Sequence, residues 1–255
     1  MSEAASCPEA SVVVDGLTKV FRDRKRGDVR AADDIHFEAQ PGEIFALLGV
    51  NGAGKTTTLR MLSTMLKPSA GDAFLCGFSV KTKPQQVRQR IGFLSAATSL
   101  YGRLTAREMV TYFGRLNRMP PARIKERVTE LFDLFDMQAF ADTRCDKLST
   151  GMKQKVSIVR TVLHDPQVMI FDEPTAGLDV LTSRTIVDFV RDCRRRGKCV
   201  IFSTHIMEEV ERLCDRVGVI HDGKLLACES LADLKQRAPS GRVEDAFVAL
   251  VEGVA

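Results

Sequence analysis

The sequence has no long apolar segment and no recognisable secretory signal. Its longest apolar run covers residues 44–50, whereas a membrane-spanning helix needs roughly 20 such residues. The first eight residues are polar and acidic, without a basic region followed by an apolar stretch. We therefore expect a chain that reaches a membrane only through a partner.

Paired cysteines and a strong charge bias are also missing. The seven cysteines are odd in number and none forms a C-x-x-C pair, which argues against a disulfide framework or a zinc site and favours a reduced, cytosolic compartment. The net charge of +4 is small for 255 residues, and acidic and basic residues are interleaved. No nucleic-acid partner is expected.

What is present indicates an α/β fold. A β-rich run at residues 43–48 ends at a glycine-rich loop, and residues 56–66 follow at helical period. Two short strands are expected at 11–14 and 35–39, with an exposed turn over 22–30 between them. Residues 1–10 are expected to form a disordered lead-in.

The middle and the C-terminal part differ in pattern. Thr105 and Glu108 form a capping box that opens a helix through about Asn117, and residues 96–150 are expected to be a helical insertion into the α/β core. The second helix of this insertion is expected at 122–137. The later α/β elements are a strand at 168–172, a helix at 181–196, a strand at 199–203, a helix at 207–214, a hairpin turning at residues 222–223, and a tail of short helices from residue 230 onward.

Residues 49–56 match the phosphate-binding pattern G-x-x-x-x-G-K-[ST] at every fixed position. The segment also lies after an expected strand and opens an expected helix. Glycines let backbone N–H groups approach phosphate oxygens, and the helix N-terminus favours negative charge. Lys55 is expected to reach the β- and γ-phosphates, and the Thr56 hydroxyl to ligate Mg²⁺.

A second acidic element follows the apolar run 168–171. Asp172 and Glu173 would stand at the carboxyl edge of a buried strand, where ligands bind in open α/β sheets. We expect Asp172 to hold Mg²⁺, directly or through water, and Glu173 to orient and deprotonate the attacking water. An isolated Asp-Glu pair would more simply be two solvated acids; the nearby phosphate loop favours the functional interpretation.

Taken together, residues 49–56, 148–154, 172–179 and 203–205 resemble the nucleotide-binding subunit of ABC transporters. The similarity runs from about Val12 to Val251. Leu148-Ser149-Thr150-Gly151-Met152 stands where the family has its L-S-G-G-Q signature, with Thr150 and Met152 departing from it. The resemblance implies a P-loop NTPase core with a mixed central sheet, an N-terminal antiparallel β subdomain and an inserted α-helical subdomain, over residues 11–229, followed by a helical tail at 230–255.

The resemblance also implies roles for individual residues. Glu173 and His205 would be catalytic, with His205 contacting the γ-phosphate, and Thr56 and Asp172 would bind Mg²⁺. Phe21 stands where an aromatic residue stacks on adenine, although an ordinary strand-edge phenylalanine fits the position equally. The residues implied to bind ATP are Phe21, Gly49, Val50, Asn51, Gly52, Ala53, Gly54, Lys55, Thr56, Thr57, Ser149 and Gly151.

One departure concerns coupling to the membrane subunit. Ala96 stands where the family normally has a glutamine that contacts Mg²⁺ and water. Alanine can do neither, so the usual coupling route is in doubt. The loop through residues 100–105 and the sequence L-S-T-G-M-K-Q-K are most similar to the NatA-type branch, which is associated with sodium efflux and related exporters.

The resemblance implies partners as well as chemistry. A polytopic membrane permease encoded separately would hold the chain at the cytoplasmic face of the cell membrane. A second copy, or a homologous ATPase subunit, would form a head-to-tail dimer with two ATP molecules between the subunits. Two alternatives remain open: a soluble ABC ATPase acting on ribosomes or DNA, and an ATP-binding switch with negligible hydrolysis.

Overall fold

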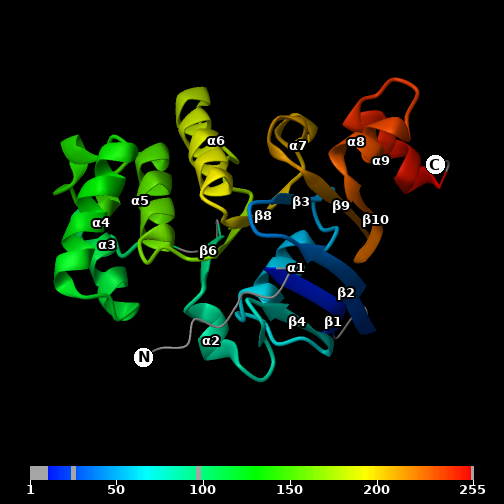
Figure 1. Cartoon of the computed structure of the whole chain (residues 1–255), viewed down its shortest axis with the longest axis horizontal. Helices are drawn as coiled ribbons and strands as arrows, with labels where there is room; N and C mark the ends of the chain where they lie inside the picture. The colour runs from blue at the N-terminus through cyan, green and yellow to red at the C-terminus, as the bar shows by residue number, and fades with distance from the viewer. Residues whose placement is uncertain (1–10, 24–26, 96–98, 254–255) are drawn as a thin grey trace.

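The computed structural model describes residues 11–23, 27–95 and 99–253. These residues form two sheets, with helices packed at one end and around the larger sheet (Figure 1). The helices are α1 Lys55–Leu62, α2 Pro84–Arg88, α3 Ala106–Leu116, α4 Pro121–Leu134, α5 Thr150–Val162, α6 Val180–Arg195, α7 Met207–Leu213, α8 Leu231–Gln236 and α9 Val243–Glu252. None of these helices is long and apolar enough to cross a membrane.

The smaller sheet is antiparallel and has the strand order β2-β1-β4-β5. Its strands are β1 Val12–Asp23, β2 Gly27–Ala39, β4 Ala70–Leu75 and β5 Phe78–Ser79. This sheet corresponds to the expected N-terminal antiparallel subdomain.

The larger sheet is mixed and has the strand order β10-β9-β3-β8-β7-β6. Its strands are β3 Ile44–Leu48, β6 Ile91–Ser95, β7 Val168–Asp172, β8 Cys199–Thr204, β9 Arg216–His221 and β10 Lys224–Ser230. Neighbouring strands are parallel except for the β9–β10 hairpin. Leu48 therefore lies beside Thr204, and Asp172 beside Ser203, so the segments following β3, β7 and β8 leave the same edge of the sheet.

The central strand β3 separates two parts of the hydrophobic core. Ile44, Ala46 and Leu48 face a cluster that includes residues of the helical insertion, whereas Phe45 and Leu47 face a cluster shared with β1, β2 and α1. All five side chains are fully buried, as expected for a strand covered on both faces. This burial makes the strand a rigid support for the loop that follows it.

The helices α3, α4 and α5 lie together at one end of the molecule, in green (Figure 1). The first two fall within the helical insertion predicted at 96–150, whereas α5 begins at Thr150 and runs beyond it. The predicted capping box is confirmed: the Thr105 hydroxyl accepts a 3.2 Å bond from Glu108 N, and Glu108 Oε2 accepts one of 2.8 Å from Thr105 N. The tail helices α8 and α9 lie at the opposite end.

Several predicted boundaries were wrong. The two N-terminal strands extend well beyond 11–14 and 35–39, because main-chain pairing continues as far as Asp23 with Gly27 although side chains such as those of Phe21, Arg22 and Val29 are exposed. The helices predicted at 56–66 and 122–137 end at Leu62 and Leu134. The elements β4, β5, α2 and β6 were not predicted. Residues 1–10 and Ala96 lie outside the described residues.

Candidate functional site

The loop between β3 and α1 borders a cavity of about 140 Å³ at the carboxyl edge of the larger sheet. Glu173, which follows β7, and Ala31 of β2 complete its wall. The lining residues are Ala31, Asn51, Gly52, Ala53, Gly54, Lys55, Thr56, Thr57 and Glu173. Most of the loop residues predicted to bind phosphates therefore face one small space.

Two glycines of the loop are required by close main-chain approaches. A Cβ on Gly49 would lie 2.3 Å from the Ile220 carbonyl oxygen, and one on Gly54 would lie 2.4 Å from the Ala31 carbonyl oxygen. Gly54 also has φ +110°, which side-chain-bearing residues rarely adopt. These glycines let the loop fit between the two sheets and end in the first turn of α1.

Lys55 is held inside the loop that carries it. Its side chain is 5% exposed, and Nζ donates to the carbonyl oxygens of Gly49, at 2.7 Å, and Val50, at 3.1 Å. Burial lowers the pKa of the Lys55 ammonium, while the nearby carboxylates of Glu173 and Asp172 act to raise it. The cation thus stands at the cavity with main-chain acceptors that an anionic ligand can replace.

Asp172 and Thr56 form the pair of oxygen donors predicted to bind a metal. The Thr56 hydroxyl donates to Asp172 Oδ1 at 2.9 Å, and the buried Ser203 hydroxyl donates to the same oxygen at 2.8 Å. Mg²⁺ takes hard oxygen ligands and usually keeps waters or phosphate oxygens, so this pair fits it. Among the residues described, no group of three or more His, Cys, Asp or Glu could hold a metal alone. A metal here would need phosphate oxygens and water as further ligands.

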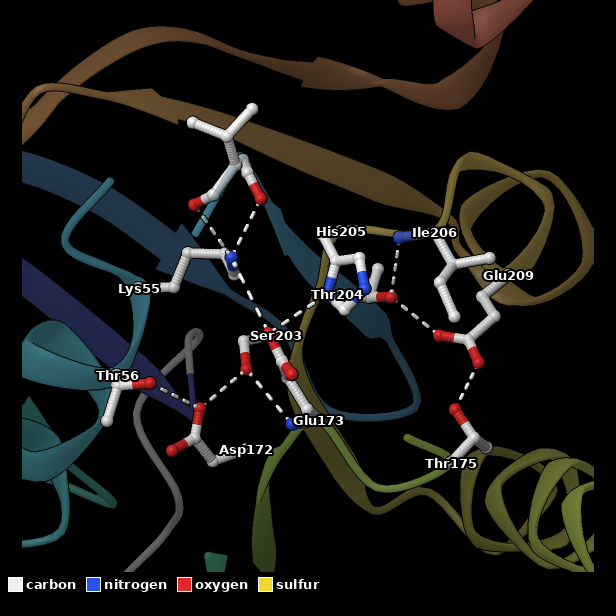
Figure 2. A network of polar contacts seen from close by, with 12 residues as sticks. Lys55, Thr56, Asp172, Glu173, Thr175, Ser203, Thr204, His205, Ile206 and Glu209 are labelled. Atoms are coloured by element: carbon white, nitrogen blue, oxygen red, sulfur yellow. Dashed lines mark hydrogen bonds and ion pairs between the residues drawn. The ribbon is translucent and has the colours of Figure 1, made fainter. Parts of the chain in front are cut away.

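Glu173 has an unusual backbone conformation and two important neighbours. Its φ of 50° is in the left-handed region, a conformation that costs a non-glycine residue roughly 1–3 kcal/mol and persists only where surrounding contacts fix it. Its N–H donates to the Ser203 hydroxyl at 3.1 Å and to the Ser203 carbonyl at 3.2 Å. Its Oε1 lies 3.1 Å from His205 Nδ1 and 3.7 Å from Lys55 Nζ (Figure 2). The structure therefore brings together the predicted base, lysine and histidine.

Ser203 and Ala31 contribute to this site, and sequence reasoning gave neither a role. Ser203 is fully buried and contacts both acids through one hydroxyl. It lies 31 residues from Asp172 in the chain, so only the parallel register of β7 and β8 places it there. A hydroxyl within an otherwise apolar strand run was the available signal.

Other predicted residues lie elsewhere. Ser149 is the N-cap of α5, accepting a 3.2 Å bond from Met152 N, and a Cβ on Gly151 would lie 3.2 Å from the Thr182 hydroxyl of α6. Phe21 is 42% exposed and pairs with Val29 in the β1–β2 hairpin. Within the described chain, these three residues are not part of the cavity wall.

The cavity combines groups suited to cleaving a phosphate chain. Glycine-rich main chain and a helix N-terminus can bind phosphate oxygens, and Lys55 can compensate their charge. Glu173 is a carboxylate at the cavity wall that can accept a proton from water, with His205 beside it. Transfer of a phosphoryl group to water is the reaction for which this arrangement is suited.

Known proteins are similar to this chain in both sequence and fold. Residues 32–176 match the family model described as ABC transporter. The chain is 40% identical over 245 residues to the ABC transporter ATP-binding protein NatA of Bacillus subtilis, covering 95% of this chain and 99% of that protein. It is 39% identical over 220 residues to the Nod factor export ATP-binding protein I of Paraburkholderia xenovorans, covering 86% and 71%. A solved ATP-binding subunit of an ABC transporter superposes with a TM-score of 0.84 at 27% identity, covering 94% and 99%.

Proposed function

The chain belongs to the ABC transporter family, as an ATP-binding subunit with ATPase activity, and we propose that it energises export through a separate membrane permease. The observation that carries the catalytic part is the position of the Glu173 carboxylate, within 4 Å of both Lys55 Nζ and His205 Nδ1. This position supports the roles proposed for Glu173 as the base, Lys55 as the phosphate-binding cation and His205 as a second polar group beside the base.

In the proposed reaction, the phosphate chain of ATP lies against the loop at residues 49–57. Lys55 exchanges a main-chain carbonyl for a phosphate oxygen, so its ammonium then bonds to an anionic acceptor instead of a neutral one. Glu173 orients the attacking water and takes its proton, and His205 contacts the γ-phosphate. Thr56 and Asp172 would hold Mg²⁺, which neutralises charge on the phosphate oxygens when bound. Phe21 would stack on the adenine.

A second subunit is part of the proposal. Ser149 and Gly151 resemble the signature that contacts ATP in this family, yet in this chain Ser149 is exposed, Gly151 lies against α6, and neither residue lines the phosphate cavity. A head-to-tail partner would supply these residues to the nucleotide of the first subunit. The partner is proposed to be a second copy or a homologous ATPase subunit.

The proposed cargo direction and location follow from the relatives and the branch. A relative named for Nod factor export supports export, and similarity to NatA, of the branch associated with sodium efflux, makes sodium ion the first cargo to test. The permease would hold the chain at the cytoplasmic face of the membrane. Co-purification with a polytopic membrane protein is the expected result, whereas co-sedimentation with ribosomes would contradict it.

Glu173→Gln tests the catalytic assignment. The amide keeps the side-chain volume but cannot take a proton from water, so turnover should fall about 100-fold or more, the usual contribution of a general base. Phosphate release measures turnover, and calorimetry should show that MgATP still binds. Glu208→Gln changes a nearby exposed acid on α7 and serves as the matched control. Turnover near the wild-type rate in Glu173→Gln would remove Glu173 from this role.

A further inference from the structure

The carboxylate of Glu209, in the first turn of α7, contacts two segments that follow different strands. Its Oε2 accepts a 2.6 Å hydrogen bond from the Thr204 hydroxyl, at the end of β8. Its Oε1 accepts a hydrogen bond from the Thr175 hydroxyl, three residues beyond the end of β7. Both threonines are buried. One side chain therefore joins the two segments (Figure 2).

These two segments carry Glu173 and His205, the two residues proposed to be catalytic. Glu173 stands two residues before Thr175, and His205 directly follows Thr204. Their side chains lie 3.1 Å apart, from Oε1 to Nδ1. Glu209 is bonded to the chain on each side of this contact without taking part in it.

Helix capping explains only half of this arrangement. The Ile206 N–H at the start of α7 donates to the Thr204 hydroxyl at 3.0 Å, and that hydroxyl in turn donates to Glu209. Of the two threonines, only Thr204 takes part in this relayed cap. Thr175 is 34 residues away in the chain and contributes nothing to the end of α7. Its bond to Glu209 indicates a role in joining the two segments.

The segment after Glu173 is fixed from a second side. Gln154 of α5 donates through Nε2 to the Pro174 carbonyl oxygen at 2.8 Å. Backbone in the left-handed region, as at Glu173, persists where surrounding contacts over-determine it. The Thr175–Glu209 bond supplies such a contact next to the strained residue.

We propose that Glu209 is a positioning residue for ATP hydrolysis, which holds Thr175 and Thr204 together and so sets the Glu173 carboxylate relative to His205. The inference rests on the proposed function. Glu209 acts through other residues and does not touch the nucleotide. Its loss should therefore lower kcat and leave the affinity for MgATP unchanged, because small misplacements of reacting groups cost rate more than binding.

Thr175→Val is the most selective test. Valine keeps the shape of the buried side chain and replaces only its hydroxyl with a methyl group, so the relayed cap on α7 stays intact. We expect kcat to fall about tenfold or more, as misplacement of catalytic groups does, with an unchanged Kd for MgATP by calorimetry. Thr175→Ser keeps the hydroxyl, so its kcat should stay within about twofold of the wild-type value.

Glu209→Ala should lower kcat by a similar factor, and Glu208→Ala, its exposed neighbour in the same helical turn, should not. In the double variant of Thr175→Val with Glu209→Ala, kcat should fall no further than in Glu209→Ala alone, because Glu209→Ala already removes the bond to Thr175. Thermal unfolding checks that each variant folds, and Thr175→Val carries the test if Glu209→Ala does not.

Wild-type kcat in Thr175→Val, or losses that multiply in the double variant, would overturn the inference. If Glu173→Gln abolishes turnover while Thr175→Val does not, only the role of Glu209 is wrong. If the wild-type chain itself does not hydrolyse ATP, the proposed function and this inference both fail.

Discussion

At the scale of single residues, the site is organised by buried hydroxyl groups. The Ser203 hydroxyl donates to Asp172 and accepts from the Glu173 N–H, so one group orients both acids. Buried polar groups need such partners, because an unpaired one costs roughly 1–3 kcal/mol. Asp172, the proposed metal ligand, and Glu173, the proposed base, are thus linked through the side chain of Ser203, which has neither role.

Ser203→Ala should impair metal use as well as stability. Asp172 would lose one of two hydrogen bonds to Oδ1, so we expect half-maximal ATPase activity to need about tenfold more Mg²⁺. The free energy of unfolding should fall by about 1–3 kcal/mol. Magnesium titration of phosphate release and urea unfolding measure the two effects. Ser203→Cys, with a weak thiol donor, should fall between. Unchanged values in both measurements would show that the hydroxyl is dispensable.

At the scale of elements, the structures that could be predicted from the sequence are those whose hydrogen bonds join residues close together in the chain. The loop at 49–56 and the box of Thr105 with Glu108 need only neighbouring residues and main chain, so both were predictable. The outer β1–β2 pairing was not, because it depends on main-chain bonds between exposed residues such as Phe21 and Val29. The contacts of Ser203 could not be predicted either, because they depend on the register between β7 and β8.

The capping box makes a quantitative prediction for α3. Thr105→Ala removes the acceptor for Glu108 N at the start of the helix, and loss of such a cap costs about 1 kcal/mol of protein stability. Urea unfolding measures the change, and Thr105→Ser should keep nearly all of the stability. Nucleotide affinity should be unaffected, because α3 lies outside the phosphate cavity. A Thr105→Ala protein as stable as the wild type would show that tertiary packing alone fixes this helix end.

At the scale of the whole molecule, the phosphate cavity is separate from residues 148–152, which stand where the family has its signature. Gly151 lies against Thr182, next to Asp179, which caps α6 through a 2.9 Å bond from Thr182 N. This packing ties the start of α5 to α6 and leaves no contact with the loop that carries Lys55 among the bonds described. The sequence suggested a second subunit through the family resemblance, and the position of Ser149 gives that proposal a physical basis.

A dimer that sandwiches ATP can be tested with charge at Ser149. Glu173→Gln with MgATP should sediment as a dimer and with ADP as a monomer, because the closed state would persist without hydrolysis. Adding Ser149→Asp keeps an oxygen that can cap α5 but places a negative charge opposite the partner's γ-phosphate. We expect the dimer to weaken tenfold or more, about 1.4 kcal/mol.

Ser149→Asn, an equally good cap without charge, should weaken the dimer less than Ser149→Asp does. Both variants should bind MgATP as monomers with wild-type affinity, because Ser149 is not among the residues lining the cavity of its own subunit. Sedimentation velocity separates the states, and calorimetry measures the affinity. If Ser149→Asp dimerises as strongly as Glu173→Gln alone, the start of α5 does not face the nucleotide of a second subunit, and the head-to-tail arrangement is wrong.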